Sequence, residues 1–122
     1  EEPDFTAYRG FSGKEVSAFL RVHESILRMF EARGVDPALG SKLPALFQTL
    51  GAKDLEVEND APLARGGAAI ATMMSLSAAS LKEKYLATGK VTPLDLEAYE
   101  RFAHDPEAWA IYYATIGATG RK

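Results

Sequence analysis

The chain has 122 residues, of which 47% are hydrophobic and 25% are charged, a composition that indicates one globular domain or a part of one. Its net charge of −3 disfavours nucleic acid and anionic lipid, so we expect neither as a partner. The absence of cysteine excludes disulfides, thiolate metal sites and a cysteine nucleophile, and fits the cytoplasmic location that we expect. No apolar run approaches the roughly 18 residues that a membrane-spanning helix needs.

The first third of the chain predicts a loop followed by a long helix. Residues 1–13 combine glycines with aromatic side chains, which is typical of a loop that still buries part of its surface. Ser12 and Glu15 have the spacing of a capping box, in which the two side chains bind backbone N–H groups of the first helical turn. Apolar residues then recur every three or four positions, so a helix should run to Arg33 and end at Gly34.

A shorter helix and a strand should follow. Residues 41–50 predict a helix with Pro44 in its first turn and with Gly51 at its end. Residues 54–58 alternate polar and apolar side chains, which predicts a strand with one face in solvent.

Two further helices are predicted in the second half of the chain. Residues 66–88 are rich in alanine, methionine, leucine and serine, and they predict a helix that ends near Gly89. Thr92 followed by Pro93 and Asp95 is a strong helix start, because it combines an N-cap, a proline at the first position and an acid in the first turn.

The C-terminal region predicts a strand that lacks partners. Residues 109–116 predict a strand, in which residues 110–116 are apolar on both faces, as in a strand covered on both sides of a sheet. Residues 117–122 should fray. A sheet of only this strand and residues 54–58 would be marginal in water. Because the chain also begins at Glu1 without a methionine, we expect it to be a piece of a longer protein.

A few polar residues invite a functional interpretation. Glu1, Glu2 and Asp4 form an acidic group that could orient a polar substrate or act as a base, although a solvated terminus is the simpler interpretation. His23 lies on the apolar side of its helix without a carboxylate or a second histidine at metal-binding spacing. A buried, hydrogen-bonded histidine explains it more simply than a base or a metal ligand does.

No catalytic motif stands out. The glycine-rich stretches 65–67 and 117–120 do not have the strand–loop–helix context of a phosphate loop, and no triad, paired-carboxylate or zinc pattern is present. The residues alone therefore predict a mostly helical α+β chain with two strands, with no metal site and no identifiable catalytic residue.

Several segments, taken in order, do match a known family. They are Glu1–Phe5, an acidic-proline stretch that resembles the end of a fifth strand; residues 14–33, a helix; residues 34–40; residues 51–55, which match the pattern G-(A/L)-x-D-(L/V) at the start of a sixth strand; and residues 105–109, which precede a closing seventh strand. Together they resemble the C-terminal portion of class I S-adenosylmethionine-dependent methyltransferases, of the bacterial ubiquinone/menaquinone-biosynthesis type.

The resemblance implies the fold, the cofactor and the substrate side of a site. Residues 1–122 would be the C-terminal part of a Rossmann-like α/β fold, with the substrate-lid helices and the last two strands. S-adenosylmethionine would serve the parent enzyme but not this chain alone, which lacks the glycine-rich loop and ribose-binding acid of the family. By location, the residues facing a small-molecule methyl acceptor would be Asp4, Phe5, Tyr8, Phe11 and His23.

Two hypotheses remain open at this point. The first is an inactive C-terminal segment of a methyltransferase, whose reaction would be a nucleophilic displacement assisted by positioning and desolvation. The second is an autonomous helical interaction or ligand-binding module without catalytic activity. Under the first, the unpartnered strand predicts a homo-oligomer, including one formed by exchange of segments between copies.

Overall fold

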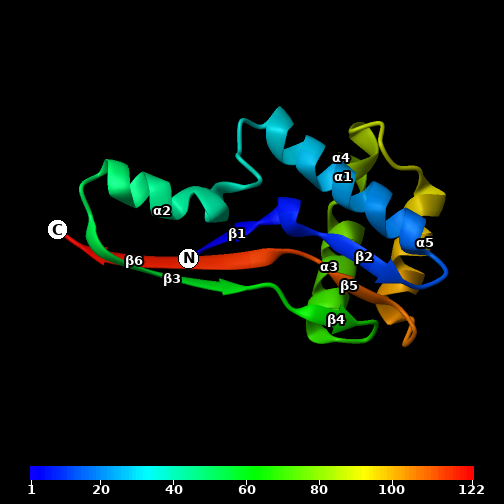
Figure 1. Cartoon of the computed structure of the whole chain (residues 1–122). Helices are drawn as coiled ribbons and strands as arrows, with labels where there is room; N and C mark the ends of the chain where they lie inside the picture. The colour runs from blue at the N-terminus through cyan, green and yellow to red at the C-terminus, as the bar shows by residue number, and fades with distance from the viewer.

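A computed structural model describes the whole chain, residues 1–122, and shows an α+β fold with five helices and two three-stranded antiparallel sheets (Figure 1). The elements in order are β1 (Glu2–Asp4), the 3-10 turn η1 (Phe5–Ala7), β2 (Arg9–Ser12), α1 (Val16–Ala32), α2 (Leu39–Thr49), β3 (Lys53–Asp60), β4 (Leu63–Arg65), α3 (Ala69–Ser80), α4 (Lys82–Ala87), α5 (Pro93–His104), β5 (Trp109–Ile111) and β6 (Ala114–Arg121). None of the helices is both long enough and apolar enough to cross a membrane.

One half of the molecule, which we call the sheet half, consists of the sheet β1-β6-β3 and helix α2 (Figure 1). β6 lies in the centre and is antiparallel to both neighbours, so β1 and β3 run parallel to each other. α2 packs on one face, where Ala114 and Ile116 are buried. The other face is uncovered, because a Cβ atom added at Gly117 would meet only the Cβ of Glu58, at 3.9 Å.

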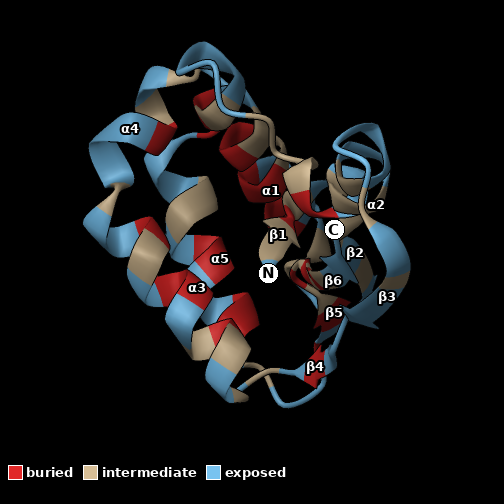
Figure 2. Cartoon of the chain, turned by 90° about the vertical axis from the view of Figure 1, so that its left-hand side faces the viewer, coloured by how far each residue is buried: buried red, intermediate tan, exposed pale blue.

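The other half, which we call the helical half, contains the sheet β2-β5-β4 and helices α1, α3, α4 and α5. The strands of this sheet carry small residues where they pair: Gly10 of β2 and Ala64 of β4 both lie opposite Ala110 of the central strand β5. Figure 2 shows buried segments on α1, α3 and α5. The largest fully buried side chains are Tyr99, Tyr112, Phe19, Phe102, His23 and Val22.

The first predicted helix is confirmed, but its predicted cap is wrong. α1 buries Phe19, Val22 and Ile26 at helical spacing, and Gly34 follows it with a φ of 71°. The capping box does not form, because Ser12 belongs to β2 and its hydroxyl donates to the carbonyl of Glu107. Glu15 instead forms an ion pair with Arg101 of α5, at 3.1 Å.

The second helix begins two residues earlier than predicted, at Leu39, so Pro44 lies beyond its first turn. Gly51, with a φ of 82°, follows this helix as predicted. The predicted strand at 54–58 is confirmed as part of β3.

The predicted helix 66–88 is in fact two helices that meet at Leu81. The turn there directs α4 toward α1, where Tyr85 becomes buried. The start of the next helix is confirmed in detail: the hydroxyl of Thr92 accepts from the N–H of Asp95, and the carboxylate of Asp95 accepts from the N–H of Thr92.

The predictions for the C-terminal strand and for the two ends of the chain are wrong. Residues 109–116 are not one strand, because Tyr112 and Tyr113 separate β5 from β6. β5 is the central strand of one sheet and β6 is the central strand of the other. Partners are therefore present within the chain, and the structure has six strands instead of two. Residues 117–121 do not fray but belong to β6, and residues 1–13 contain β1 and β2.

Candidate functional site

The carboxyl ends of β1 and β3 define the edge of the sheet that is the candidate site. The two strands are parallel, so both end on the side that faces the helical half (Figure 1). Ligands of sheets with parallel strands bind beyond the carboxyl ends of those strands. Here the chain continues from β1 into η1 and Tyr8, which are close to α1.

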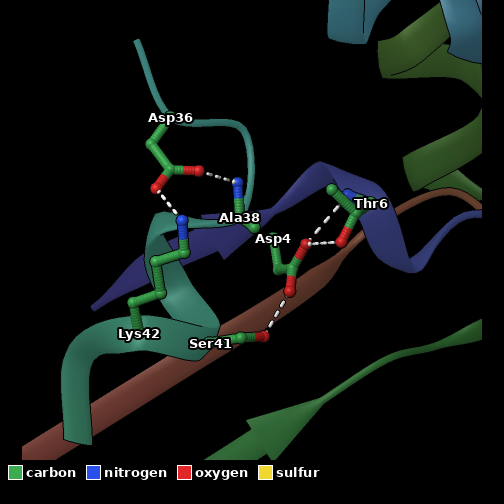
Figure 3. A network of polar contacts seen from close by, with 6 residues as sticks. All are labelled: Asp4, Thr6, Asp36, Ala38, Ser41 and Lys42. Atoms are coloured by element: carbon green, nitrogen blue, oxygen red, sulfur yellow. Dashed lines mark hydrogen bonds and ion pairs between the residues drawn. The ribbon is translucent and has the colours of Figure 1, made fainter. Parts of the chain in front are cut away.

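Asp4, the last residue of β1, is held by hydrogen bonds within the protein (Figure 3). Its Oδ1 accepts from the backbone N–H of Thr6 at 2.8 Å and from the Thr6 hydroxyl at 2.5 Å, and its Oδ2 accepts from the hydroxyl of Ser41 on α2. Burial by itself would raise the pKa of Asp4, but the hydrogen bonds from Ser41 and Thr6 outweigh it and lower the pKa. The ionised carboxylate thus ties β1 to α2.

A second carboxylate lies at the start of α2. Asp36 accepts from the N–H of Ala38 at 2.9 Å and from the ammonium group of Lys42 (Figure 3). The hydrogen bond from Lys42, followed by that from Ala38, lowers the pKa of Asp36. With Asp4 and Asp36 both at this helix terminus, the protein itself supplies the negative charge that the terminus favours.

Phe5 follows Asp4 and packs between the two halves. Its ring centroid lies 5.0 Å from that of Phe30 on α1 and 5.2 Å from that of Tyr113. Its N–H donates to the carbonyl of Pro37 at 2.8 Å. Phe5 also borders a shallow hollow of about 260 Å³ next to Pro37.

Farther inside, His23 lies in a group of aromatic residues. The imidazole is 1% exposed, and its Nε2 lies 2.9 Å from the hydroxyl of Tyr99 on α5. Burial lowers the pKa of His23 to about 3, so the ring is neutral at pH 7. Its Nδ1 is buried without any hydrogen-bond partner.

The hydrogen-bond pattern favours one tautomer of His23. If the Tyr99 hydroxyl donates to Nε2, the only unpaired group is an N–H at Nδ1. The reverse arrangement leaves both the Tyr99 hydroxyl hydrogen and the Nδ1 lone pair unpaired. The first arrangement leaves fewer buried groups unpaired, and the remaining unpaired donor costs on the order of 1–3 kcal/mol.

We define the His23 cluster as His23 with the aromatic side chains of Tyr8, Phe19, Tyr99 and Tyr112. The ring centroids of Phe19 and Tyr8 lie 4.3 Å and 5.1 Å from that of His23. Burial raises the pKa of Tyr8, Tyr99 and Tyr112, so these hydroxyls stay protonated at neutral pH. The cluster provides packing and one unpaired donor, and no group poised to remove a proton.

Of the five residues predicted to face an acceptor, only Tyr8 and His23 lie in the His23 cluster. Asp4 and Phe5 lie nearby at the end of β1, whereas Phe11 is 50% exposed on β2, where the guanidinium of Arg9 lies 5.1 Å from its ring centroid. Sequence reasoning did not identify Tyr99 or Tyr112 as members of this group, because their only signal was an apolar position on a helix and a strand.

The glycines at 66 and 67 do have a strand before them and a helix after them, contrary to the sequence-based prediction. They still do not form a phosphate loop. The N–H of Gly66 donates to Ala108 O at 2.9 Å, and that of Gly67 donates to Ala103 O at 2.7 Å. A Cβ at Gly66 would lie 1.9 Å from the carbonyl oxygen of Asp105, so this loop is closed by protein backbone.

An apolar groove runs along the outer face of α3. It has a volume of about 670 Å³, and no charged residue lines it. The lining residues are Ala69, Thr72, Met73, Leu76, Ser77, Ser80 and Leu81. Such a surface suits an uncharged, apolar group. No set of three or more histidine, aspartate or glutamate side chains is arranged to hold a metal ion.

Comparison with known proteins adds no relative: no protein-family model matches the chain, and no curated protein sequence matches it significantly.

Proposed function

We propose that this chain is the C-terminal, substrate-side segment of an S-adenosylmethionine-dependent methyltransferase that acts on a small-molecule acceptor. The observation that carries the proposal is the sheet β1-β6-β3. β1 and β3 contain residues that the family resemblance equates with the fifth strand and with the start of the sixth, and β6 contains residues 114–116 of the predicted seventh strand. β6 lies between β1 and β3 and pairs with both.

The proposal places the rest of the enzyme on the uncovered face of this sheet. Sheets whose neighbouring strands run parallel are covered by helices on both faces, whereas an antiparallel sheet such as β1-β6-β3 can leave one face in solvent. Here α2 covers one face only, while Glu56, Glu58 and Thr119 point outward beside Gly117 on the other. The elements of a cofactor-binding half would pack on this second face and along the free edge of β1.

We propose that the cofactor is held by a part of the enzyme other than this chain. Its one strand–glycine–helix connection, at residues 65–67, uses its N–H groups within the protein. We therefore assign no step of methyl transfer to this chain. Its proposed contribution is to position the acceptor and to exclude water from it, with Asp4, Phe5, Tyr8, Phe11 and His23 on the acceptor side.

The second candidate is an autonomous interaction or ligand-binding module. It is favoured by the helical half, which has a complete core of its own, and by the apolar groove on α3. The two candidates differ in whether the natural polypeptide that carries this sequence binds S-adenosylmethionine.

The deciding experiment isolates that polypeptide from its source with an antibody against this chain and measures its intact mass and its binding of radiolabelled S-adenosylmethionine. We expect a polypeptide longer by about 100–200 residues that binds the cofactor. The isolated 122-residue chain is the control and should not bind it. A natural protein of 122 residues without cofactor binding would reject the methyltransferase and favour the module.

A further inference from the structure

Four segments connect the sheet half to the helical half, and two of them pass beside His23. Tyr8 belongs to the segment between β1 and β2, and Tyr112 belongs to the segment between β5 and β6. Their ring centroids lie 5.1 Å and 5.7 Å from that of His23. His23 on α1 is therefore in contact with both connections at once.

The two connections also contact each other. Phe5, at the start of η1, lies 5.2 Å from Tyr113 between ring centroids, and Tyr113 immediately follows Tyr112. A displacement of Tyr8 and Tyr112 away from His23 would consequently disturb both connections together.

The surroundings of His23 contain no charge that could balance an imidazolium. The groups that face it are Tyr8 and Tyr112 from the two connections, Tyr99 from α5 and Phe19 from α1 itself. All four are uncharged at neutral pH.

Two acidic side chains, one on α1 and one on α5, are engaged in ion pairs. Glu24, the next residue on α1, has its carboxylate 3.3 Å from Arg28, and Asp95 of α5 has its carboxylate 2.9 Å from Arg21. A buried cation without a partner is strongly unfavourable.

We propose that His23 is an acid-sensitive contact that holds the two halves together, and that its protonation opens the junction formed by Tyr8, Tyr112 and His23. Tyr8 is the half-buried member of the His23 cluster, so it is the ring whose displacement exposes the imidazole to water. Opening separates the two connections from α1 and leaves the helices intact. This inference concerns the chain itself and does not depend on the proposed function.

The direction of the pH dependence follows from the two states. In the closed state burial lowers the pKa of His23 from 6.5 to about 3, whereas in the open state the ring is in water. The open state therefore binds the proton more tightly. Each pH unit of acidification between 6.5 and 3 raises the ratio of open to closed molecules about tenfold, and above pH 6.5 His23 contributes no further change.

The test is an NMR titration of this chain that follows the imidazole signals of its two histidines together with the ring signals of Tyr8 and Tyr112. His104, which is exposed on α5, is the internal control for an imidazole in contact with solvent. We expect the closed-state signal of His23 to lose intensity without moving as the pH falls, with the Tyr8 and Tyr112 signals changing at the same midpoint. Amide signals of α1 and α5 should persist through this step.

Two variants separate His23 from other acid-sensitive groups. In His23→Phe, the ring signal of Tyr112 should no longer change at the pH midpoint at which His23 responds in the wild type. In His104→Gln, the ring signal of Tyr112 should change as it does in the wild type. If His23→Phe does not fold, the wild-type titration still decides. A His23 signal that shifts smoothly while Tyr8 and Tyr112 stay unchanged, or equal acid responses in His23→Phe and wild type, would overturn the inference.

Discussion

The two halves of this protein differ in how completely each buries its own apolar surface. The helical half surrounds Phe19, Tyr99 and Phe102 on all sides, and each of these side chains is at most 1% exposed. The sheet half has α2 on one face and nothing on the other, and it leaves Leu50 83% exposed and Val57 50% exposed.

This difference in burial bears on the proposal that the chain is part of a larger protein. A half that closes around its own core is stable without additional contacts, since most of the hydrophobic stabilisation comes from apolar area removed from water. A three-stranded sheet covered on one side only has less of this stabilisation. This difference in burial is what we expect if the sheet half continues into a larger α/β sheet, as proposed above.

The largest effect should come from the core of the helical half. Phe19→Ala removes a ring that packs against His23, Phe102 and Tyr112, and it should lower the free energy of unfolding by about 3–5 kcal/mol. Urea denaturation followed by circular dichroism measures this loss. Phe11→Ala, at a ring that is half exposed, is the matched control, with a change of about 0.5 kcal/mol or less. Equal losses in the two variants would mean that the helical half lacks the core described above.

The next largest effect should separate the two faces of the sheet half. Gly40 of α2 lies against β1 so closely that a Cβ would be 2.5 Å from Glu2 O and 2.8 Å from Pro3 O. Gly40→Ala should therefore displace α2 and cost about 1–3 kcal/mol in thermal or urea unfolding.

Gly117→Ala is the control for Gly40→Ala, because it adds the same methyl group on the uncovered face. The nearest atom there is 3.9 Å away, so stability should change by no more than about 0.5 kcal/mol. A large loss for Gly117→Ala would show that this face is covered by something in the isolated chain.

Asp4 provides a pH-dependent test of the contact between β1 and α2. Its pKa is lower in the folded chain than the ordinary 3.8, so it stabilises the fold above that value and loses this contribution as the pH falls through its lowered pKa. Asp4→Asn should reduce stability by about 1–3 kcal/mol at pH 7 and less in acid. Asp60→Asn, at an exposed site, is the control. A loss that does not depend on pH would argue against a role for the ionised carboxylate.

The smallest effect is expected on the outer face of α3. Leu76 is mostly exposed, so Leu76→Ser should alter stability by about 0.5 kcal/mol or less. The same change should weaken fluorescence of an apolar dye that binds the groove on α3. Dye fluorescence equal to that of the wild type would indicate that the groove does not bind apolar groups.

Local signals in the sequence predicted α1, the start of α5 and β3 well. The apolar spacing of α1 and the Thr92–Asp95 cap are each encoded within a few residues, so they can be read without knowing the rest of the fold. The capping box at Ser12 failed because strand pairing of β2 competes for that residue.

Long-range pairing could not be predicted in the same way. The division of residues 109–116 at Tyr112 depends on β5 and β6 joining different sheets, and no local signal in this apolar stretch marks the division. Likewise, His23 was identifiable as a residue on an apolar face, but its contact with Tyr99 spans 76 residues and has no local signature. The contacts that His23 makes with residues distant in the sequence could therefore not be predicted from local patterns.

Native-state hydrogen exchange of the isolated chain tests the contrast between the halves most directly. Amides of α1 and α5 should exchange only through global unfolding, because they surround the closed core. Amides of β3, at the edge of a sheet with one uncovered face, should exchange through local opening at a much lower free energy. Equal protection of β3 and α1 would contradict the account, because it would mean that the sheet half is complete without further protein.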